Sequence, residues 1–186
     1  MKKRTVSLLL LLTAASVVVF GQSQAPTGGV SISFRFSSLA RMASNQYAIW
    51  IEDENGGFVR TVFVTDFVAR RGGWRFRPQA LPRWTNAAHV GDVSPSEIDA
   101  MSGATPDDGS YRVSWDLRDL RGKVVPSGTY RYLIEANIYW ENRVLWSGTL
   151  QIGNGPQESH ATATFSSPDA EQMGAVISDV AASYMP

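Results

Sequence analysis

The sequence predicts an all-β protein: an antiparallel immunoglobulin-like sandwich with one long irregular insertion. The first observation is that apolar and polar residues alternate with period two through most of the chain after residue 29. The second is that turn residues, chiefly Gly, Pro and one Asn-Gly pair, separate these runs at short intervals. Seven or eight short strands divided in this way favour two packed antiparallel sheets.

The first three strands are predicted at residues 30–36, 46–53 and 58–65. The first alternates strictly, so that one face is apolar and the other is polar. The second and third flank Asn55-Gly56, a pair that is typical of a β-hairpin because both residues tolerate positive φ. These two strands are therefore expected to pair directly.

The later strands follow the same period. They are expected at residues 109–116, 128–140, 143–152 and 159–165. The tail at 175–184 aligns Val180 with Ala182 and Tyr184 as a strand would, but four residues also fit a helical stripe, and both interpretations stay open. The stripe consists of Met173, Val176, Ile177 and Val180.

Residues 70–105 form the irregular insertion. A segment this long without strands is usually functional, disordered or wrongly assigned, and the motif at its end favours a functional role. Ser94-Pro95-Ser96-Glu97 has the capping-box spacing with proline at the first helical position, which predicts a short helix there. Ile98 and Met101 are expected to face the core, with Gly103 as a left-handed cap. Thr105 is then expected on an accessible turn.

The N-terminus predicts export. A basic start is followed by an apolar run with five consecutive leucines, which is typical of a signal peptide at residues 1–21, with cleavage no later than residue 25. A short extension at 22–29 and a single sandwich domain at 30–186 are expected to follow. The mature protein is therefore expected to be periplasmic or secreted, without stable membrane insertion.

Composition excludes several functions. The mature chain holds 14 basic and 17 acidic residues, a net charge of −3, which disfavours nucleic acid as a partner. It has no cysteine, and its two histidines, His89 and His160, form no metal-ligand pattern. Since the serines lack a nucleophile-elbow setting, we expect no catalytic residue and no metal site, and a protein that is not an enzyme.

One motif carries most of the functional information. Residues 99–105 read Asp-x-x-Ser-Gly-Ala-Thr, which resembles the acceptor motif at which periplasmic flavin transferases attach FMN to a threonine hydroxyl. This resemblance implies covalent FMN on Thr105 and an electron carrier. It also implies that Asp99, Ser102, Gly103 and Ala104 form the recognition loop, and that the partners are a flavin transferase and a membrane-bound redox protein.

There are two further resemblances, the first confined to one hairpin and the second extending over most of the domain. The segment from Trp115-Asp116 to Gly128-Thr129-Tyr130 resembles a hairpin of the immunoglobulin-like domain in flagellar hook-capping proteins. There Trp115 and Tyr130 are expected to pack across the core while Asp116 and Asp119 bind turn amides.

The chain from about residue 47 to 165 resembles a family of predicted periplasmic proteins known as a domain of unknown function. The shared features are the aromatic strand 47–53, a downstream tryptophan at Trp84, and the 99–105 motif. Family members are linked to flavin transferases and membrane redox proteins, which implies extracytoplasmic electron transfer.

Alternatives remain open at each feature. The Ser-Gly-Ala-Thr sequence also suits an ordinary turn, and the protein is then a non-catalytic binding or scaffold module. Trp84 is expected either to stack on the isoalloxazine ring or to pack in the core. Five arginines close together are expected either to meet the flavin phosphate or an acidic partner, or to form a solvated edge; they are Arg70, Arg71, Arg75, Arg77 and Arg83.

Overall fold

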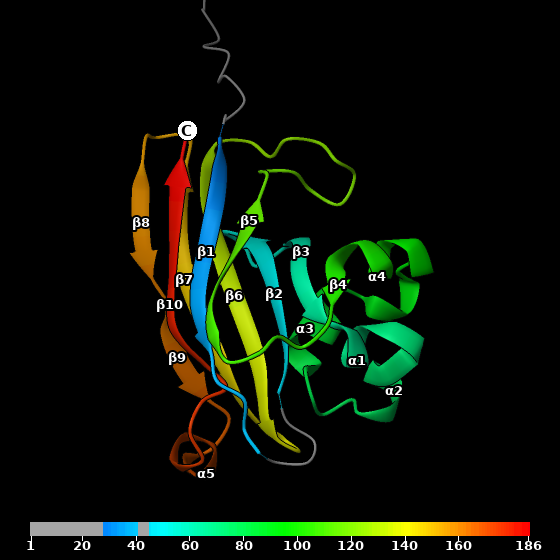
Figure 1. Ribbon diagram of the computed structural model, residues 1–186. Coiled ribbons are helices and arrows are strands. Elements are labelled where there is room, and N and C mark those ends of the chain that lie inside the picture. The colour runs from blue at the N-terminus through cyan, green and yellow to red at the C-terminus, as the bar shows by residue number, and fades with distance from the viewer. Residues whose placement is uncertain (1–27, 41–44) are drawn as a thin grey trace, which may run out of the picture.

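A computed structural model describes residues 28–40 and 45–186, and Figure 1 shows two β-sheets packed face to face with short helices against one of them. The predicted all-β sandwich is confirmed. The predicted signal peptide at 1–21 lies outside the described residues.

The four-stranded sheet has the order β5-β1-β10-β8 and is antiparallel throughout. Its strands are β5 (Gly109–Trp115), β1 (Gly29–Phe36), β10 (Ile177–Met185) and β8 (Gln157–His160). The strand interpretation of the tail is confirmed, because β10 pairs with β1 on one side and β8 on the other. Val180, Ala182 and Tyr184 all point into the core, as period two requires.

The six-stranded sheet has the order β4-β3-β2-β6-β7-β9. Its strands are β4 (Ser102–Gly103), β3 (Phe58–Thr65), β2 (Gln46–Asp53), β6 (Gly128–Tyr139), β7 (Asn142–Ile152) and β9 (Thr162–Phe165). All pairs are antiparallel except β3–β4. The predicted hairpin at Asn55-Gly56 is confirmed: Asp53 Oδ1 accepts from the amides of Asn55 and Gly57, which closes the turn.

The single strand expected at 159–165 is wrong. The chain forms two strands there, β8 in the four-stranded sheet and β9 in the six-stranded sheet. Between them, the amide of Ala161 donates to the carbonyl of Val180. Apolar and polar residues keep alternating through the crossing, so the change of pairing partner leaves no mark on the residue pattern.

The core between the sheets holds the apolar faces of both. Trp115 and Tyr130 pack as predicted, with ring centroids 5.4 Å apart. In the loop between their strands, Asp116 Oδ1 accepts from the amide of Arg118, and Asp119 Oδ1 accepts from the amides of Arg121 and Lys123, again as predicted.

The insertion differs from the irregular segment that the sequence predicts, because it folds into a layer of short helices. They are α1 (Asp66–Ala69), η1 (Arg70–Gly72), α2 (Gly73–Phe76), α3 (Pro82–Ala87), η2 (Val90–Asp92) and α4 (Pro95–Met101). A further short helix outside this layer, α5 (Pro168–Gln172), precedes β10. Helices α1 to α4 cover the outer face of the six-stranded sheet (Figure 1).

A second hydrophobic cluster joins this helical layer to the sheet. Trp50 and Leu133 contribute from β2 and β6, while Leu81, Trp84 and Ile98 contribute from the helical side. Strand β2 is consequently buried on both faces, with Ile49 and Ile51 in the sandwich core. The short helices are stabilised by this burial, since four residues cannot form a stable helix alone.

Candidate functional site

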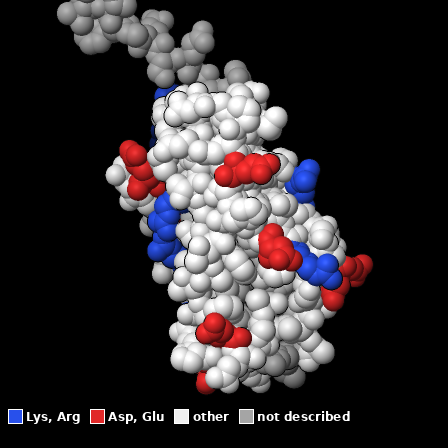
Figure 2. Space-filling view, turned by 90° about the vertical axis from the view of Figure 1, so that its left-hand side faces the viewer, with Lys and Arg blue, Asp and Glu red and all other residues white. Residues whose placement is uncertain are grey.

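Charge is not concentrated on the side of the sandwich remote from the helical layer. Figure 2 shows this side, where the acidic and basic side chains of the described residues lie scattered over a largely uncharged surface. The helical layer, in contrast, contains the motif, the arginines and the grooves. The candidate site is therefore built from that layer.

Helix α4 leads directly into β4, so the 99–105 motif lies at the edge of the six-stranded sheet. The predicted capping box is present: Ser94 Oγ accepts from the amide of Glu97 at 3.3 Å, and Glu97 Oε2 accepts from the amide of Ser94 at 3.0 Å. The hydroxyl of Ser94 also donates to Glu97 Oε2 at 2.6 Å, and this bond together with the one from the Ser94 amide holds the pKa of Glu97 below its usual range. Ile98 is buried and Met101 half-buried, so the helix packs on the face that the sequence predicts.

Gly103 is not a left-handed cap, and this prediction is wrong. The helix ends at Met101, and Ser102–Gly103 then runs as an extended strand parallel to β3, with Gly103 opposite Thr65. Glycine is required there for packing, since a Cβ at position 103 would lie 2.8 Å from Cε2 of Phe63. The glycine of the motif thus has a role inside the fold.

Arg70 connects two motif residues to the helical layer. Its Nε donates to Ser102 Oγ at 3.0 Å and lies 3.4 Å from Asp99 Oδ1 and 3.0 Å from Asp66 Oδ1. We call these four residues the Arg70 cluster. The sequence analysis missed Asp66, although its i,i+4 spacing from Arg70 was a usable signal. The cluster fixes the start of the motif while Asp99 stays 66% exposed.

Thr105 lies in a loop that is anchored at both ends. Ala104 and Thr105 are exposed and follow β4 without regular structure. Beyond them, the amide and hydroxyl of Ser38 both donate to Asp108 Oδ1, at 2.7 and 2.6 Å. These bonds lower the pKa of Asp108. The threonine hydroxyl is therefore accessible on a short segment held between β4 and β5, although that segment is not the turn that the sequence predicts.

Trp84 is a core residue and offers no exposed ring to a flavin. Its side chain is fully buried in the second hydrophobic cluster, and its indole N–H donates to Thr61 Oγ1 at 2.9 Å. Its amide donates to Glu135 Oε2 at 2.9 Å. Of the two interpretations of Trp84, packing in the core is therefore correct, and Trp84 is not part of the candidate flavin site.

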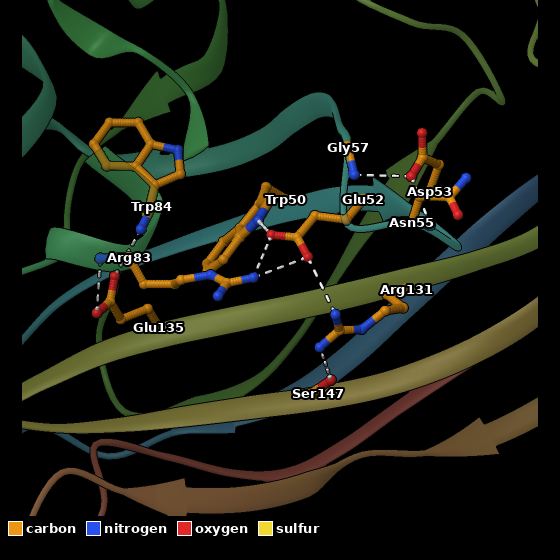
Figure 3. Close-up of polar contacts among 10 residues, drawn as sticks. All are labelled: Trp50, Glu52, Asp53, Asn55, Gly57, Arg83, Trp84, Arg131, Glu135 and Ser147. Atoms are coloured by element: carbon orange, nitrogen blue, oxygen red, sulfur yellow. Dashed lines mark hydrogen bonds and ion pairs between the residues drawn. The ribbon is translucent and has the colours of Figure 1, made fainter. Parts of the chain in front are cut away.

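Two buried carboxylates attach α3 to the sheet (Figure 3). Glu52, which is 1% exposed, accepts from Nη2 of Arg83 with both oxygens, at 2.9 and 3.1 Å, and from the indole N–H of Trp50 at 3.0 Å. Arg131, directly across from Glu52 on β6, adds a contact at 3.4 Å. Figure 3 also shows the turn contact between Asp53 and Gly57 and the bond from Arg131 to Ser147, which lie outside the attachment of α3.

Glu135 caps the first turn of α3. Its carboxylate accepts from the amides of Arg83 and Trp84, and Arg143 Nε lies 3.6 Å from Oε1. Burial raises the pKa of Glu135 to about 7, and the amide bonds and arginines oppose the shift only in part. A shifted carboxyl is a common mark of an active site. Here the carboxylate of Glu135 accepts hydrogen bonds from the backbone amides of α3, so the role of Glu135 is structural.

The arginines divide between the fold and the surface. Arg83 is committed to Glu52, and Arg77 donates to Asn137 Oδ1 at 3.0 Å with its guanidinium 5.6 Å from the ring of Trp140. The exposed Arg75 instead lies 4.7 Å from the ring of Trp74. Arg70 and Arg75 both line the groove described next.

A groove of about 540 Å³ lies beside the motif, between η1–α2 on one side and η2–α4 on the other. We call it the Trp74 groove. The residues that line it include Arg70, Trp74, Arg75, Gly91, Ile98 and Asp99. Arg70 and Asp99 belong to both the groove and the Arg70 cluster, so the groove opens next to the residues that hold the motif.

A second, smaller cavity of about 300 Å³ lies on the other side of α4, where the two sheets separate. Phe58 and Val62 from β3, Met101 from α4 and Trp115 from β5 line it. Arg60 and Asp116 form an ion pair at 3.4 Å at its edge. The motif segment thus forms a wall between two hollows.

Together, these features define a β-sandwich protein whose helical layer presents an exposed threonine on an anchored loop. The chain belongs to the family described as Predicted periplasmic protein (DUF2271), whose family model matches residues 29–166. The family resemblance and the periplasmic location that the sequence predicts are both confirmed by this match. No curated protein and no solved structure matches the chain. Within residues 28–40 and 45–186, no helix has the length and apolar character to span a membrane.

Proposed function

We propose that this protein carries FMN covalently on Thr105 and transfers electrons in the periplasm. The observation that carries the proposal is the exposure of Thr105 directly after motif residues that are held in place. A transferase needs an accessible hydroxyl on a segment of defined position, and the anchored loop between β4 and β5 provides one.

The attachment is a transfer from FAD. The Thr105 hydroxyl oxygen forms a bond to the phosphorus of the FMN half, and the pyrophosphate bond breaks with AMP as the leaving group. The hydroxyl proton passes to a base of the transferase, and the product is a threonine phosphodiester. Small side chains at Gly103 and Ala104 leave room for the transferase at this loop. When bound, FMN supplies reversible electron transfer.

In this proposal Asp99, Ser102, Gly103 and Ala104 are recognition residues and the protein is not itself a catalyst. Its partners are a periplasmic flavin transferase, which loads it, and a membrane-bound redox protein, which exchanges electrons with it. Nothing in this role requires nucleic acid or insertion into the membrane.

The test is the intact mass of the exported protein after coexpression with a periplasmic flavin transferase. We expect a gain of one FMN less one water, mapped to the Thr105 peptide. Thr105→Ala should abolish the gain while changing the free energy of unfolding by less than about 0.5 kcal/mol, since the side chain is exposed. Thr164→Ala, at an exposed threonine of β9, is the matched control and should stay fully loaded.

A second candidate is a non-catalytic binding or scaffold module. Two observations favour it: Gly103 and Ser102 already have roles inside the fold, and the cavity between β3 and β5 is lined largely by apolar side chains. An unmodified mass, with the transferase active on a control acceptor, would sink the flavin proposal and favour this one. Purified native protein would then be colourless.

A further inference from the structure

The Trp74 groove has the chemistry of a flavin-ring site. Its floor includes the buried Ile98, and one wall is formed by the half-buried indole of Trp74. Gly91 borders the groove beside the outer edge of the indole, since an added Cβ would lie 3.5 Å from Cη2 of Trp74. A planar, largely apolar ring with polar edges suits a hollow with such walls and a few polar groups at its rim.

Charge at the rim is asymmetric. On the motif side, Arg70 faces the carboxylates of Asp66 and Asp99, so that side does not favour a phosphate. On the far side, Arg75 lies over the ring of Trp74, and none of the ion pairs among the described residues includes Arg75. A ring that gains negative charge on reduction is therefore stabilised at the Arg75 end, and the phosphodiester stays in solvent at Thr105.

The position of the groove suits a tethered ring. Ser102 is bound by Arg70, which lines the groove, and Thr105 follows three residues later on an exposed segment. The cavity on the other side of α4 lies in the opposite direction. Its lining reaches Phe58 and Arg60 near the start of β3, whereas β4 runs parallel to β3 and pairs with its far end. The chain thus leads Thr105 away from that cavity.

We propose that the Trp74 groove holds the isoalloxazine ring of the FMN attached to Thr105, with Trp74 against the ring and Arg75 at its reducible end. This inference rests on the proposed function. It assigns roles to two residues outside the motif, and it predicts that the fold itself tunes the flavin.

The experiment uses the full-length, exported protein loaded by the transferase. Trp74→Leu removes the indole and keeps an apolar side chain, while Gly91→Leu fills the groove from an exposed position. Trp140→Leu is the matched control, because Trp140 also lies under an arginine, at 5.6 Å from Arg77, but outside the groove. Intact mass verifies loading, and circular dichroism with thermal unfolding verifies the fold.

We expect the Trp74 and Gly91 variants to load normally and to show a several-fold rise in flavin fluorescence and in quenching by iodide, because the ring leaves the indole and enters solvent. Trp140→Leu should match the parent protein. Arg75→Gln should load normally and lower the midpoint potential of the flavin, because the reduced ring loses a cation.

The failures are distinguishable. If the parent protein loads with FMN but both groove variants leave fluorescence and iodide quenching unchanged, the ring lies elsewhere and the groove assignment is overturned, while the proposed function stands. If the parent protein does not load, the proposed function fails, and the groove assignment fails with it because no tethered ring exists. Should Trp74→Leu not fold, Gly91→Leu decides by the same readouts.

Discussion

Arginine–carboxylate pairs occur at both ends of the helical layer, but they serve different purposes there. At α3, the carboxylate of Glu52 is buried against the sheet and only 1% exposed, although the side chain of its partner Arg83 is 48% exposed. At the junction of α4 and β4, Arg70 also meets carboxylates, but Asp99 is 66% exposed and the loop that follows is open to solvent. One arrangement attaches a helix, and the other holds a loop in position without covering it.

This difference separates structural from functional polar residues in the molecule. The buried groups on the outer face of β2 and β6 have their hydrogen-bonding capacity taken up by α3 and by Arg131. The Arg70 cluster holds the start of the motif but leaves Ala104 and Thr105, which follow it, exposed to solvent. Binding groups are usually found on such loops, positioned by a rigid scaffold. Glu135 has a strongly raised pKa, yet it lies at the α3 end of the helical layer, where the polar groups are structural. A large pKa shift is therefore a misleading guide to the functional site in this molecule.

The largest effect is expected at Trp84. Replacement of this fully buried indole by alanine should lower the free energy of unfolding by about 3–5 kcal/mol, because it opens a cavity and leaves the Thr61 hydroxyl without its donor. Chemical denaturation measures the loss. Trp140→Ala, at a side chain that is 42% exposed, should cost less than about 1 kcal/mol. Equal losses would contradict the core assignment of Trp84.

The next effect concerns pH and Glu135. Its folded pKa of about 7 lies above the usual 4.5, so the folded state binds the proton more tightly than the unfolded chain does. The associated stability is present below pH 4.5 and is lost as pH rises through 7, by on the order of 3 kcal/mol.

Glu135→Gln should flatten this part of the pH dependence of unfolding, because an amide does not titrate. The charged groups that face the position are the guanidinium groups of Arg83 and Arg143. Denaturant unfolding at several pH values between about 4 and 8 measures the slope. A variant with the parent slope would show that another group is responsible.

Most strands could be predicted because each has its own alternation, and local turn chemistry fixed the hairpin at Asn55-Gly56 and the capping box at Ser94. The helices α1 and α2 could not be predicted, since four residues are too few to show a helical period. Helix α1 is stabilised by the burial of Val68 and Ala69 in the second hydrophobic cluster, and α2 by Trp74, which packs against the same cluster. The change of sheet after His160 is invisible for a similar reason, as it depends on partners far along the chain.

The site was predictable in composition and only partly in geometry. The motif, Thr105 and the arginines are visible in the sequence, and the structure joins Asp99 and Ser102 through Arg70. The burial of Trp84 was not visible, because its partners Thr61 and Glu135 are 23 and 51 residues away. The residues next to Gly103 suggest a helix cap, whereas its extended conformation follows from the pairing of β4 with β3, about 40 residues earlier in the chain.

The smallest effect is also the sharpest test of the comparison. Arg83→Gln leaves the buried Glu52 with Trp50 and the more distant Arg131, so we expect a loss of about 2 kcal/mol in the free energy of unfolding. Arg70→Gln removes the same residue type from exposed partners and should cost less than about 1 kcal/mol.

The two arginines should also differ in their response to salt. The Arg70 effect should fade as ionic strength rises, whereas the Arg83 effect should persist, because its partner is shielded from solvent. Denaturation at low and high salt gives both values. If Arg70→Gln were as destabilising as Arg83→Gln in high salt, the Arg70 cluster would be a second structural anchor, and the Ser-Gly-Ala-Thr segment would be better explained as part of the fold than as an acceptor for flavin.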